Sequence, residues 1–310
     1  MGLLVDGRWH DTWYDTKGNE GKFKRQASLF RNEISSTGEF APESGRYHLY
    51  VSLACPWAHR TLIMRALKGL APHISVSVVN PKMREHGWTF LPYPGATGDM
   101  LYQHQYMYQL YQRVDSNITS RVTVPVLWDT HTQQIVNNES AEIIRYFNSA
   151  FNTVTGNEDD YYPAALRSEI DAVNEWVYHD INNGVYKAGF ATEQNAYEEA
   201  VTQLFAALDK VESRLSDHAF LVGDTFTEAD IRLFTTLIRF DPVYHGHFKC
   251  NLKQIKDYPA TYDYMKRIFR MPGIAETVNF DHIKTHYYYS HTMINPTGVV
   301  PVGPSLSLWE

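Results

Sequence analysis

A cysteine followed by a proline stands where an apolar segment gives way to a helical pattern. Residues 47–54 are rich in Tyr, Val and Leu and predict a strand, and Cys55 follows directly. Pro56 suits the first position of a helix, where its missing N–H is not needed, and helical spacing continues to about residue 69. A thiol at such a junction faces free backbone N–H groups and the positive end of a helix dipole. Both favour the thiolate, so Cys55 is a candidate nucleophile.

The elements predicted after this junction follow an order typical of the thioredoxin fold. They are a strand at 74–79, a long loop at 81–100, a helix at 100–114, short strands at 122–128 and 134–137, and a helix at 139–147. With the first strand and helix, the order is β-α-β-α-β-β-α. Pro125 is unusual inside a strand-like run, and it fits if the peptide bond before it is cis.

The second half of the chain has helical periodicity. Apolar residues step by four and three along one face of a long helix: Tyr197, Val201, Leu204, Leu208, Val211 and Leu215. Residues 227–230 form a capping-box sequence that predicts a helix to about residue 240, and a further helix is expected at 259–271. The expected fold class is therefore an α/β thioredoxin-like domain followed by an all-α domain, which is the architecture of glutathione transferases.

These patterns divide the chain into five segments. The predicted boundaries are an N-terminal arm at 1–45, a thioredoxin-like domain at 46–150, a linker at 151–162, an all-helical domain at 163–285 and a C-terminal tail at 286–310.

Composition narrows the functional classes. The net charge of −7 disfavours a nucleic-acid surface and gives no support to an anionic membrane surface, and no run of about 18 apolar residues predicts a membrane span. The N-terminus lacks the pattern of a signal peptide. The two cysteines cannot build a disulfide framework, which favours a reducing, cytoplasmic compartment. No histidine cluster has metal-ligand spacing, so we expect no metal site.

The residues after Cys55 predict a monothiol mechanism. Ala58 stands where a dithiol redox motif would carry its second cysteine. A mixed disulfide on Cys55 must then be released by an external thiol such as glutathione. The alternative is a packed structural cysteine, since free cysteine is among the most buried residue types.

Glu139 and Ser140 open a helix directly after a strand. The N–H groups there and the Ser140 hydroxyl suit a carboxylate, and Glu139 suits an ammonium group, so together they match the γ-glutamyl end of glutathione. Simple helix capping is the alternative. Val124 could pair its backbone N–H and C=O with an extended peptide.

Three aromatic residues are further candidates. Trp88, in a loop with a neighbouring glycine, could cover a ligand or anchor the loop on the protein. Tyr186 lies between glycines where the helical pattern breaks, and Tyr287 lies in a tyrosine-rich stretch. Either tyrosine could hydrogen-bond a phenolic ring.

Taken together, these segments resemble the glutathionyl-hydroquinone reductases, the xi class of glutathione transferases. The resemblance covers nearly the whole chain and is carried by Tyr50–Thr61, Gly87–Phe90, Arg121–Asp129, Asn138–Ser140, Gly184–Phe190, Thr227–Arg232, Met271–Ala275, Asn279–Ile283 and Asn295–Gly298. Residues 32–45 and the tail after Val300 show no such match.

The resemblance implies reduction of S-glutathionyl-hydroquinones, with glutathione as co-substrate, and a homodimer. Cys55 would be the nucleophile, and Tyr186 and Tyr287 would face the aromatic substrate. The implied glutathione contacts are Trp88, Arg121, Val124, Glu139 and Ser140.

Two other functions fit the residues. One is an omega-type thiol transferase or dehydroascorbate reductase, which also uses a Cys-Pro site. The other is a non-enzymatic binding protein with the same fold, for which Cys55 would be unreactive. The sequence leaves open the physiological hydroquinone, the tolerance of halogenated rings and the role of Cys250.

Overall fold

The computed structural model describes residues 2–308, which form two compact units. The first unit contains residues 2–13, 26–159 and 276–290, and the second contains residues 14–25, 160–275 and 291–308. Each unit is described by itself. The domain boundaries expected along the chain stay a prediction.

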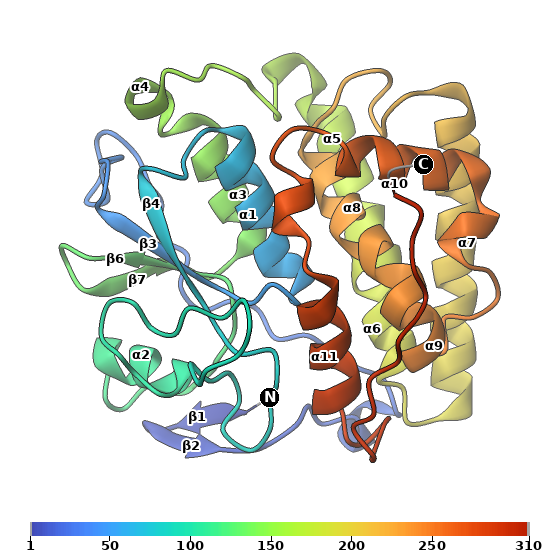
Figure 1. Cartoon of the computed structure of the whole chain (residues 1–310), viewed down its shortest axis with the longest axis horizontal. Coiled ribbons are helices and arrows are strands. Elements are labelled where there is room, and N and C mark those ends of the chain that lie inside the picture. The colour runs from blue at the N-terminus through green and yellow to red at the C-terminus, as the bar shows by residue number, and fades with distance from the viewer. Residues whose placement is uncertain (1, 309–310) are drawn as a thin grey trace. The chain divides into compact units, whose positions relative to one another are not determined.

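The first unit is built on a four-stranded sheet of order β4-β3-β6-β7 (Figure 1). Its strands are β3 (Tyr47–Val51), β4 (Ile74–Val78), β6 (Val126–Asp129) and β7 (Gln134–Asn137). β3 and β4 are parallel, whereas β6 is antiparallel to both of its neighbours. All five residues of β3 are buried, as expected for a central strand.

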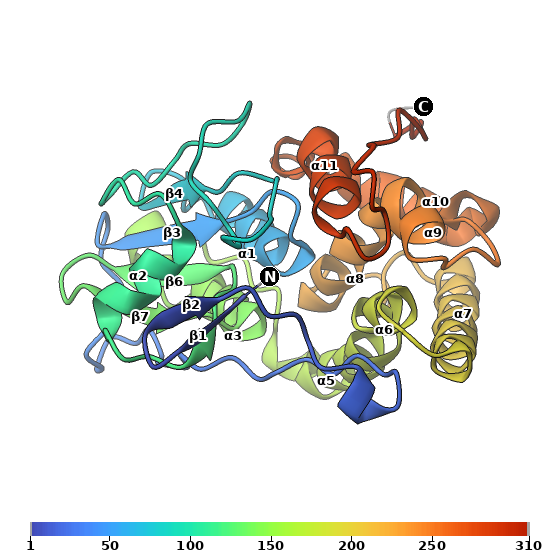
Figure 2. The ribbon, with the colours of Figure 1, turned by 90° about the horizontal axis from the view of Figure 1, so that it is seen from below.

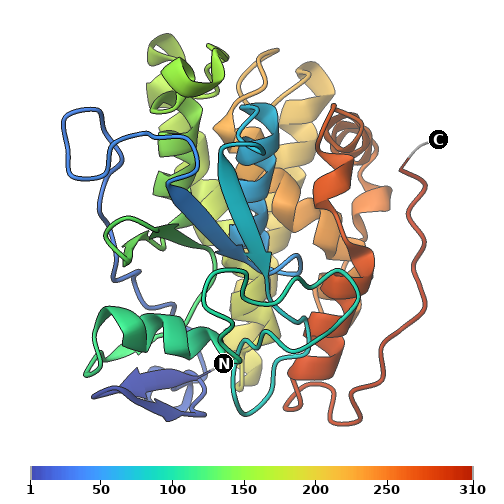
Figure 3. The same ribbon diagram turned by 60° about the vertical axis from the view of Figure 1, so that its left-hand side comes forward.

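Helices cover this sheet and connect its strands. α1 (Pro56–Leu67) joins the two parallel strands and packs against α3 (Ser140–Ser149). Figure 3 shows β3 and β4 side by side in front of α1. The remaining helices of the unit are α2 (Met107–Val114), α4 (Asn152–Thr155) and α11 (Phe280–Ser290). A small second sheet, of order β2-β1-β5, joins β1 (Leu3–Val5), β2 (Arg8–His10) and β5 (Ser120–Arg121). This unit has the thioredoxin-like fold that the element order predicted.

Two local predictions for this unit are wrong. The expected strand at 122–128 is interrupted, because β5 ends at Arg121 and β6 begins at Val126. The cis bond between Val124 and Pro125 lies in this gap, so the predicted cis geometry is confirmed. The expected helix at 100–114 begins only at Met107, because the Asp99 carboxylate accepts backbone N–H groups of the preceding turn.

The second unit is almost entirely helical. Its elements are η1 (Lys17–Asn19), η2 (Ala164–Leu166), α5 (Arg167–Trp176), η3 (Val177–Asn182), α6 (Gly184–Gly189), α7 (Gln194–Asp217), α8 (Glu228–Arg239), η4 (Phe240–Tyr244), α9 (His245–His247), η5 (Ile255–Asp257) and α10 (Pro259–Phe269). A short turn, η6 (Ala275–Thr277), contains the point along the chain at which the second unit's segment ends and the first unit resumes at Glu276. Figure 2 shows α6 and α7 side by side. The break expected around Tyr186 is wrong, because η3 is a π-helical turn that leads directly into α6.

The predicted capping box at the start of α8 is confirmed. The Thr227 hydroxyl accepts the N–H of Ala229, and the Asp230 carboxylate accepts the N–H of Thr227 at 2.8 Å. Asp230 also accepts the Leu221 N–H and the Tyr264 hydroxyl, each at 2.9 Å. Burial raises the pKa of Asp230 to about 6 despite these bonds. This buried carboxylate therefore links the start of α8 to the preceding loop and to α10.

In residues 2–308, we find no helix that combines the length and apolar character needed to cross a bilayer.

Candidate active site

Cys55 lies at the start of α1, as the sequence predicted. It is the N-cap residue, and its backbone C=O accepts the N–H of His59 at 3.0 Å. The residue is 9% exposed, and its thiol lies 3.5 Å from the backbone C=O of Val124, to which it donates. The fold therefore brings together the predicted nucleophile and the residue before the cis-proline, which are far apart in sequence.

The loop that carries Val124 is held from behind by Tyr111. The Tyr111 hydroxyl donates to the C=O of Thr123 at 2.9 Å and accepts the Thr123 N–H at 3.2 Å. Burial raises the pKa of Tyr111, so this hydroxyl keeps its proton for the bond. Tyr111 is a supporting residue that the sequence did not indicate.

Glu139 and Ser140 occupy the start of α3. Glu139 is the N-cap residue and Ser140 is the first helical residue, so the capping role considered for Ser140 belongs to Glu139. One carboxylate oxygen of Glu139 accepts the N–H of Ala141 at 3.1 Å, and the other accepts the hydroxyl of Ser28 at 3.0 Å. The N-cap position and the neighbouring hydroxyl give this helix end one charged acceptor and one polar donor.

Arg60 connects the two helix starts. Its guanidinium donates to the Ser140 hydroxyl oxygen at 3.4 Å and lies 4.5 Å from the centre of the Trp57 ring. The Arg60 side chain is 1% exposed, so its charge lies inside the unit. When the serine oxygen accepts this bond, its own proton must point elsewhere, which suits donation to an anionic ligand. His59 instead bonds to Thr277 at 2.7 Å.

Trp88 packs inside the first unit. Its ring stacks on His286 of α11, with centroids 4.6 Å apart, and its backbone C=O accepts the N–H of Met107 at 2.9 Å. Tyr287, the next residue of α11, is also buried. These contacts fit the anchoring role considered for Trp88, and a role over a ligand stays a prediction for both aromatic residues.

Arg121 bonds to the N-terminal arm. Its guanidinium donates to the backbone C=O of Thr12, to that of Trp13 at 3.1 Å, and to the Gln26 side chain at 3.3 Å. Its suggested contact with glutathione stays a prediction, and its bonds show that it also fixes the arm.

Tyr186 lies in α6 of the second unit, within an aromatic cluster. Ring neighbours lie within about 6.3 Å: Phe23, Phe190, Tyr244 and Phe248. The Arg25 guanidinium lies 5.0 Å from the centre of the Tyr186 ring, and its Nε donates to Asn183 at 2.9 Å. A cation over an aromatic face contributes about 0.5–1 kcal/mol at exposed sites. Sequence reasoning missed Arg25, because nothing in its local sequence signals this contact.

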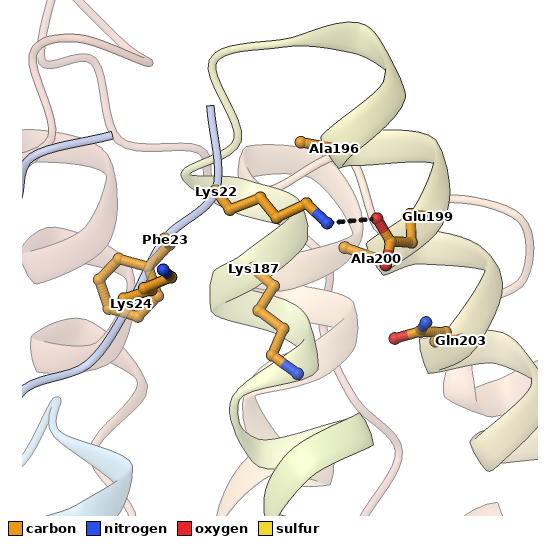
Figure 4. A pocket seen from close by; sticks show the side chains of 8 residues that line it. All are labelled: Lys22, Phe23, Lys24, Lys187, Ala196, Glu199, Ala200 and Gln203. Atoms are coloured by element: carbon orange, nitrogen blue, oxygen red, sulfur yellow. Dashed lines mark hydrogen bonds and ion pairs between the residues drawn. The ribbon is translucent and has the colours of Figure 1, made fainter. Parts of the chain in front are cut away.

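A pocket of about 220 Å³ in the second unit contains none of the predicted site residues (Figure 4). Lys22, Phe23 and Lys24 form one wall, and residues of α6 and α7 form the others. The Lys22 ammonium is paired with Glu199 at 2.8 Å, and Lys187 donates to the C=O of His179 at 2.9 Å. Two of the three lysines are thus already bonded within the protein.

The second cysteine lies inside the second unit. Cys250 is fully buried, and burial raises the pKa of its thiol. Residues 2–308 contain no group of three His, Cys, Asp or Glu side chains that could hold a metal ion.

A thioredoxin-like unit and a helical unit, with Cys55 at the N-cap of α1, are the architecture of a glutathione transferase. The glutathione S-transferase N-terminal domain matches residues 54–150, and the C-terminal domain matches residues 194–267. The chain is 60% identical to the glutathionyl-hydroquinone reductase YqjG of Escherichia coli (strain K12), over 100% of this chain and 97% of that protein.

Comparison with solved structures supports the same family. The glutathione-bound structure of YqjG superposes with a TM-score of 0.93 and 55% identity, over 100% of this chain and 97% of that one. The xi-class glutathione transferase of Natrialba magadii superposes with a TM-score of 0.95 and 48% identity, over 100% and 96% of the two chains. This chain belongs to the glutathionyl-hydroquinone reductases, the xi class of glutathione transferases.

Proposed function

We propose that this protein is an enzyme that reduces S-glutathionyl-hydroquinones to hydroquinones with glutathione as co-substrate. The observation that carries the proposal is the Cys55 thiol at the start of α1, 3.5 Å from the Val124 C=O, in a chain 60% identical to a glutathionyl-hydroquinone reductase.

In the first half-reaction, the Cys55 thiolate attacks the glutathione sulfur of the thioether. A sulfur–sulfur bond forms, the bond from sulfur to the ring carbon breaks, and its electron pair goes to the ring. The ring carbon takes a proton, which gives the hydroquinone and leaves a mixed disulfide of Cys55 and glutathione.

In the second half-reaction, a free glutathione thiolate attacks the glutathione sulfur of the mixed disulfide. Oxidised glutathione leaves, and Cys55 returns as the thiolate. Over both steps, one thioether and one glutathione give one hydroquinone and one oxidised glutathione. Ala58 cannot supply a second thiol, which supports release by an external one.

Binding of glutathione follows from the two helix starts. Ser140 and the N-terminal N–H groups of α3 would bind the γ-glutamyl carboxylate, and the Glu139 carboxylate would bind the ammonium. The backbone of Val124 would pair with the cysteinyl part, so its sulfur would point at Cys55. Trp88 and Arg121 are assigned further contacts with the tripeptide on the family resemblance.

The two tyrosines would act on the aromatic part of the substrate. Tyr186 and Tyr287 would bind the ring hydroxyls and favour the keto tautomer, from which the carbon–sulfur bond breaks more easily. Each tyrosine is buried in its own unit, which holds its ring in a fixed orientation.

The setting is proposed as a reducing cytoplasm and the assembly as a homodimer. Both cysteines are free thiols, which supports the first, and the family resemblance supports the second. Light scattering on the purified protein measures the assembly.

Mass spectrometry of the intact protein tests the chemistry. The protein is exposed to a glutathionyl-hydroquinone with no free glutathione, and we expect one added glutathione on Cys55 together with released hydroquinone. Added glutathione should then remove the adduct. A C250S variant should behave as the wild type, whereas hydroquinone release without any adduct would contradict the mechanism. Dehydroascorbate and a glutathionylated peptide, assayed in parallel, show whether the thioether is the preferred substrate.

A further inference from the structure

A segment of the N-terminal arm, residues 28–32, runs along the turn that leads from β7 into α3. The Asn32 N–H donates to the C=O of Val136 at 3.0 Å, and the Asn138 N–H donates to the C=O of Phe30 at 3.1 Å. Arg31 and Asn137 form an antiparallel bridge between these bonds. The segment thereby pairs with β7, the edge strand of the four-stranded sheet.

Side chains reinforce this pairing on both sides. The Asn138 side chain accepts the Phe30 N–H at 3.1 Å, and the Asn137 side chain donates to the C=O of Asn32 at 3.1 Å. The Arg31 Nε donates to Glu142 in the first turn of α3 at 2.8 Å. This bond, the largest cause, lowers the pKa of Glu142, so the pair is charged at neutral pH. The segment is therefore fixed on the start of α3.

Ser28, at one end of this segment, bonds directly to a predicted ligand-binding residue. Its hydroxyl lies 3.0 Å from the Glu139 Oε2 and 3.3 Å from the C=O of Asn138. The other oxygen of Glu139 accepts the N–H of Ala141. Capping of α3 needs only one carboxylate oxygen. The second bond fixes the rotation of the carboxylate, and lone pairs remain on both oxygens for a ligand.

We propose that arm residues 28–32 are part of the glutathione site and that Ser28 is a positioning residue for Glu139. Its hydroxyl holds the carboxylate in the orientation that accepts the α-ammonium group of the γ-glutamyl end. This role rests on the proposed function, because it requires Glu139 to bind that ammonium. It also assigns a binding role to a part of the arm that the sequence left without one.

Ser28→Ala is the direct test, measured by calorimetric titration of glutathione and by steady-state kinetics. We expect the Kd and the KM for glutathione to rise about 3- to 10-fold, the range that one hydrogen bond supplies. The turnover number at saturating glutathione should stay unchanged, because Cys55 is not touched. Ser28→Thr, which keeps the hydroxyl, should restore most of the affinity. Ser149→Ala, at the far end of α3, is the matched control and should bind as the wild type.

A second ligand separates positioning from general loosening of the arm. N-acetylglutathione lacks the ammonium group, so Ser28→Ala and wild type should bind it equally. An equal loss for both ligands would overturn the proposal, because it would show a structural role only, and so would unchanged binding of glutathione. Failure of the proposed function looks different, because the wild type itself would then bind no glutathione or form no adduct on Cys55.

Discussion

The two cysteines of this chain have opposite surroundings. Cys55 caps a helix in the sheet-containing unit, with its thiol on a backbone carbonyl and 9% of the residue exposed. Cys250 follows a short helix in the helical unit, is fully buried, and donates at 3.8 Å to the C=O of Phe248. Its burial opposes the thiolate, whereas a helix start favours one. We therefore predict that the two thiols differ in reactivity because of their positions in the fold.

Removal of each thiol in turn gives the largest expected contrast. Cys55→Ala removes the attacking sulfur, so turnover of a glutathionyl-hydroquinone should fall by at least about 10³-fold. Cys250→Ala leaves a small cavity but no change at the site, so its turnover should stay within about twofold of wild type. Initial rates at fixed, saturating glutathione measure both. If Cys55→Ala kept more than a tenth of the activity, Cys55 would not be the nucleophile.

Alkylation compares the two thiols without any substrate. Iodoacetamide at pH 7 should modify Cys55 at least about 100-fold faster than Cys250, because Cys55 lies at a helix start whereas Cys250 is fully buried. The Cys55 rate should change little from pH 7 to pH 8, whereas an ordinary thiol of pKa near 8.5 reacts several-fold faster over that interval. Peptide mass spectrometry measures both sites, and in guanidinium chloride they should react alike. If the Cys55 rate instead rose several-fold from pH 7 to pH 8, as that of an ordinary thiol does, the prediction of a Cys55 thiolate would be wrong.

Much of the Cys55 environment could be predicted from the sequence. The Cys-Pro junction, the cis bond before Pro125 and the helix that starts after Glu139 each have a local signal, and the structure has all three. Local signals succeed because a strand end, a helix start and a proline restrict the backbone by themselves. The same rule explains the correct prediction of the capping box at Thr227.

Contacts between distant segments could not be predicted. Ser28 bonds to Glu139 across 111 positions, and Arg25 reaches Asn183 across 158. A single serine or arginine in an irregular arm has no pattern that names its partner. The strand expected at 122–128 failed for a different, local reason, since β-branched residues favour a strand that the cis-proline interrupts.

A substitution that destabilises the helical unit should bring the alkylation rate of Cys250 closer to that of Cys55. Asp230→Asn places an amide where the carboxylate accepts four donors, so the free energy of unfolding should fall by about 2–4 kcal/mol at pH 7. Chemical denaturation measures this loss, and alkylation of Cys250 should accelerate with it. Asp217→Asn, on an exposed residue at the end of α7, is the matched control and should change neither.

The pH dependence of the same variant has a defined sign. Burial raises the pKa of Asp230 from 3.8 to about 6, so the folded state holds this proton more tightly than the unfolded state. Its contribution to stability is fully present below about pH 4 and is lost as pH rises through about 6, by about 3 kcal/mol in all. The difference between wild type and Asp230→Asn should therefore change between pH 4 and pH 7. If the difference in unfolding free energy stayed constant over this range, Asp230 would have the ordinary pKa of an aspartate.

The smallest expected effect is that of replacing Arg60, whose charge lies in the same unit as Cys55. Arg60→Met removes the donor to Ser140 and a buried positive charge at the start of α3, so glutathione affinity should fall about tenfold. Arg60→Lys keeps the charge with a different shape and should recover part of the loss. Calorimetry with glutathione and with its ester at the γ-glutamyl carboxylate distinguishes the causes. If the charge acts on that carboxylate, the variants should differ for glutathione and converge for the ester. An equal loss for both ligands would make Arg60 a packing residue between α1 and α3.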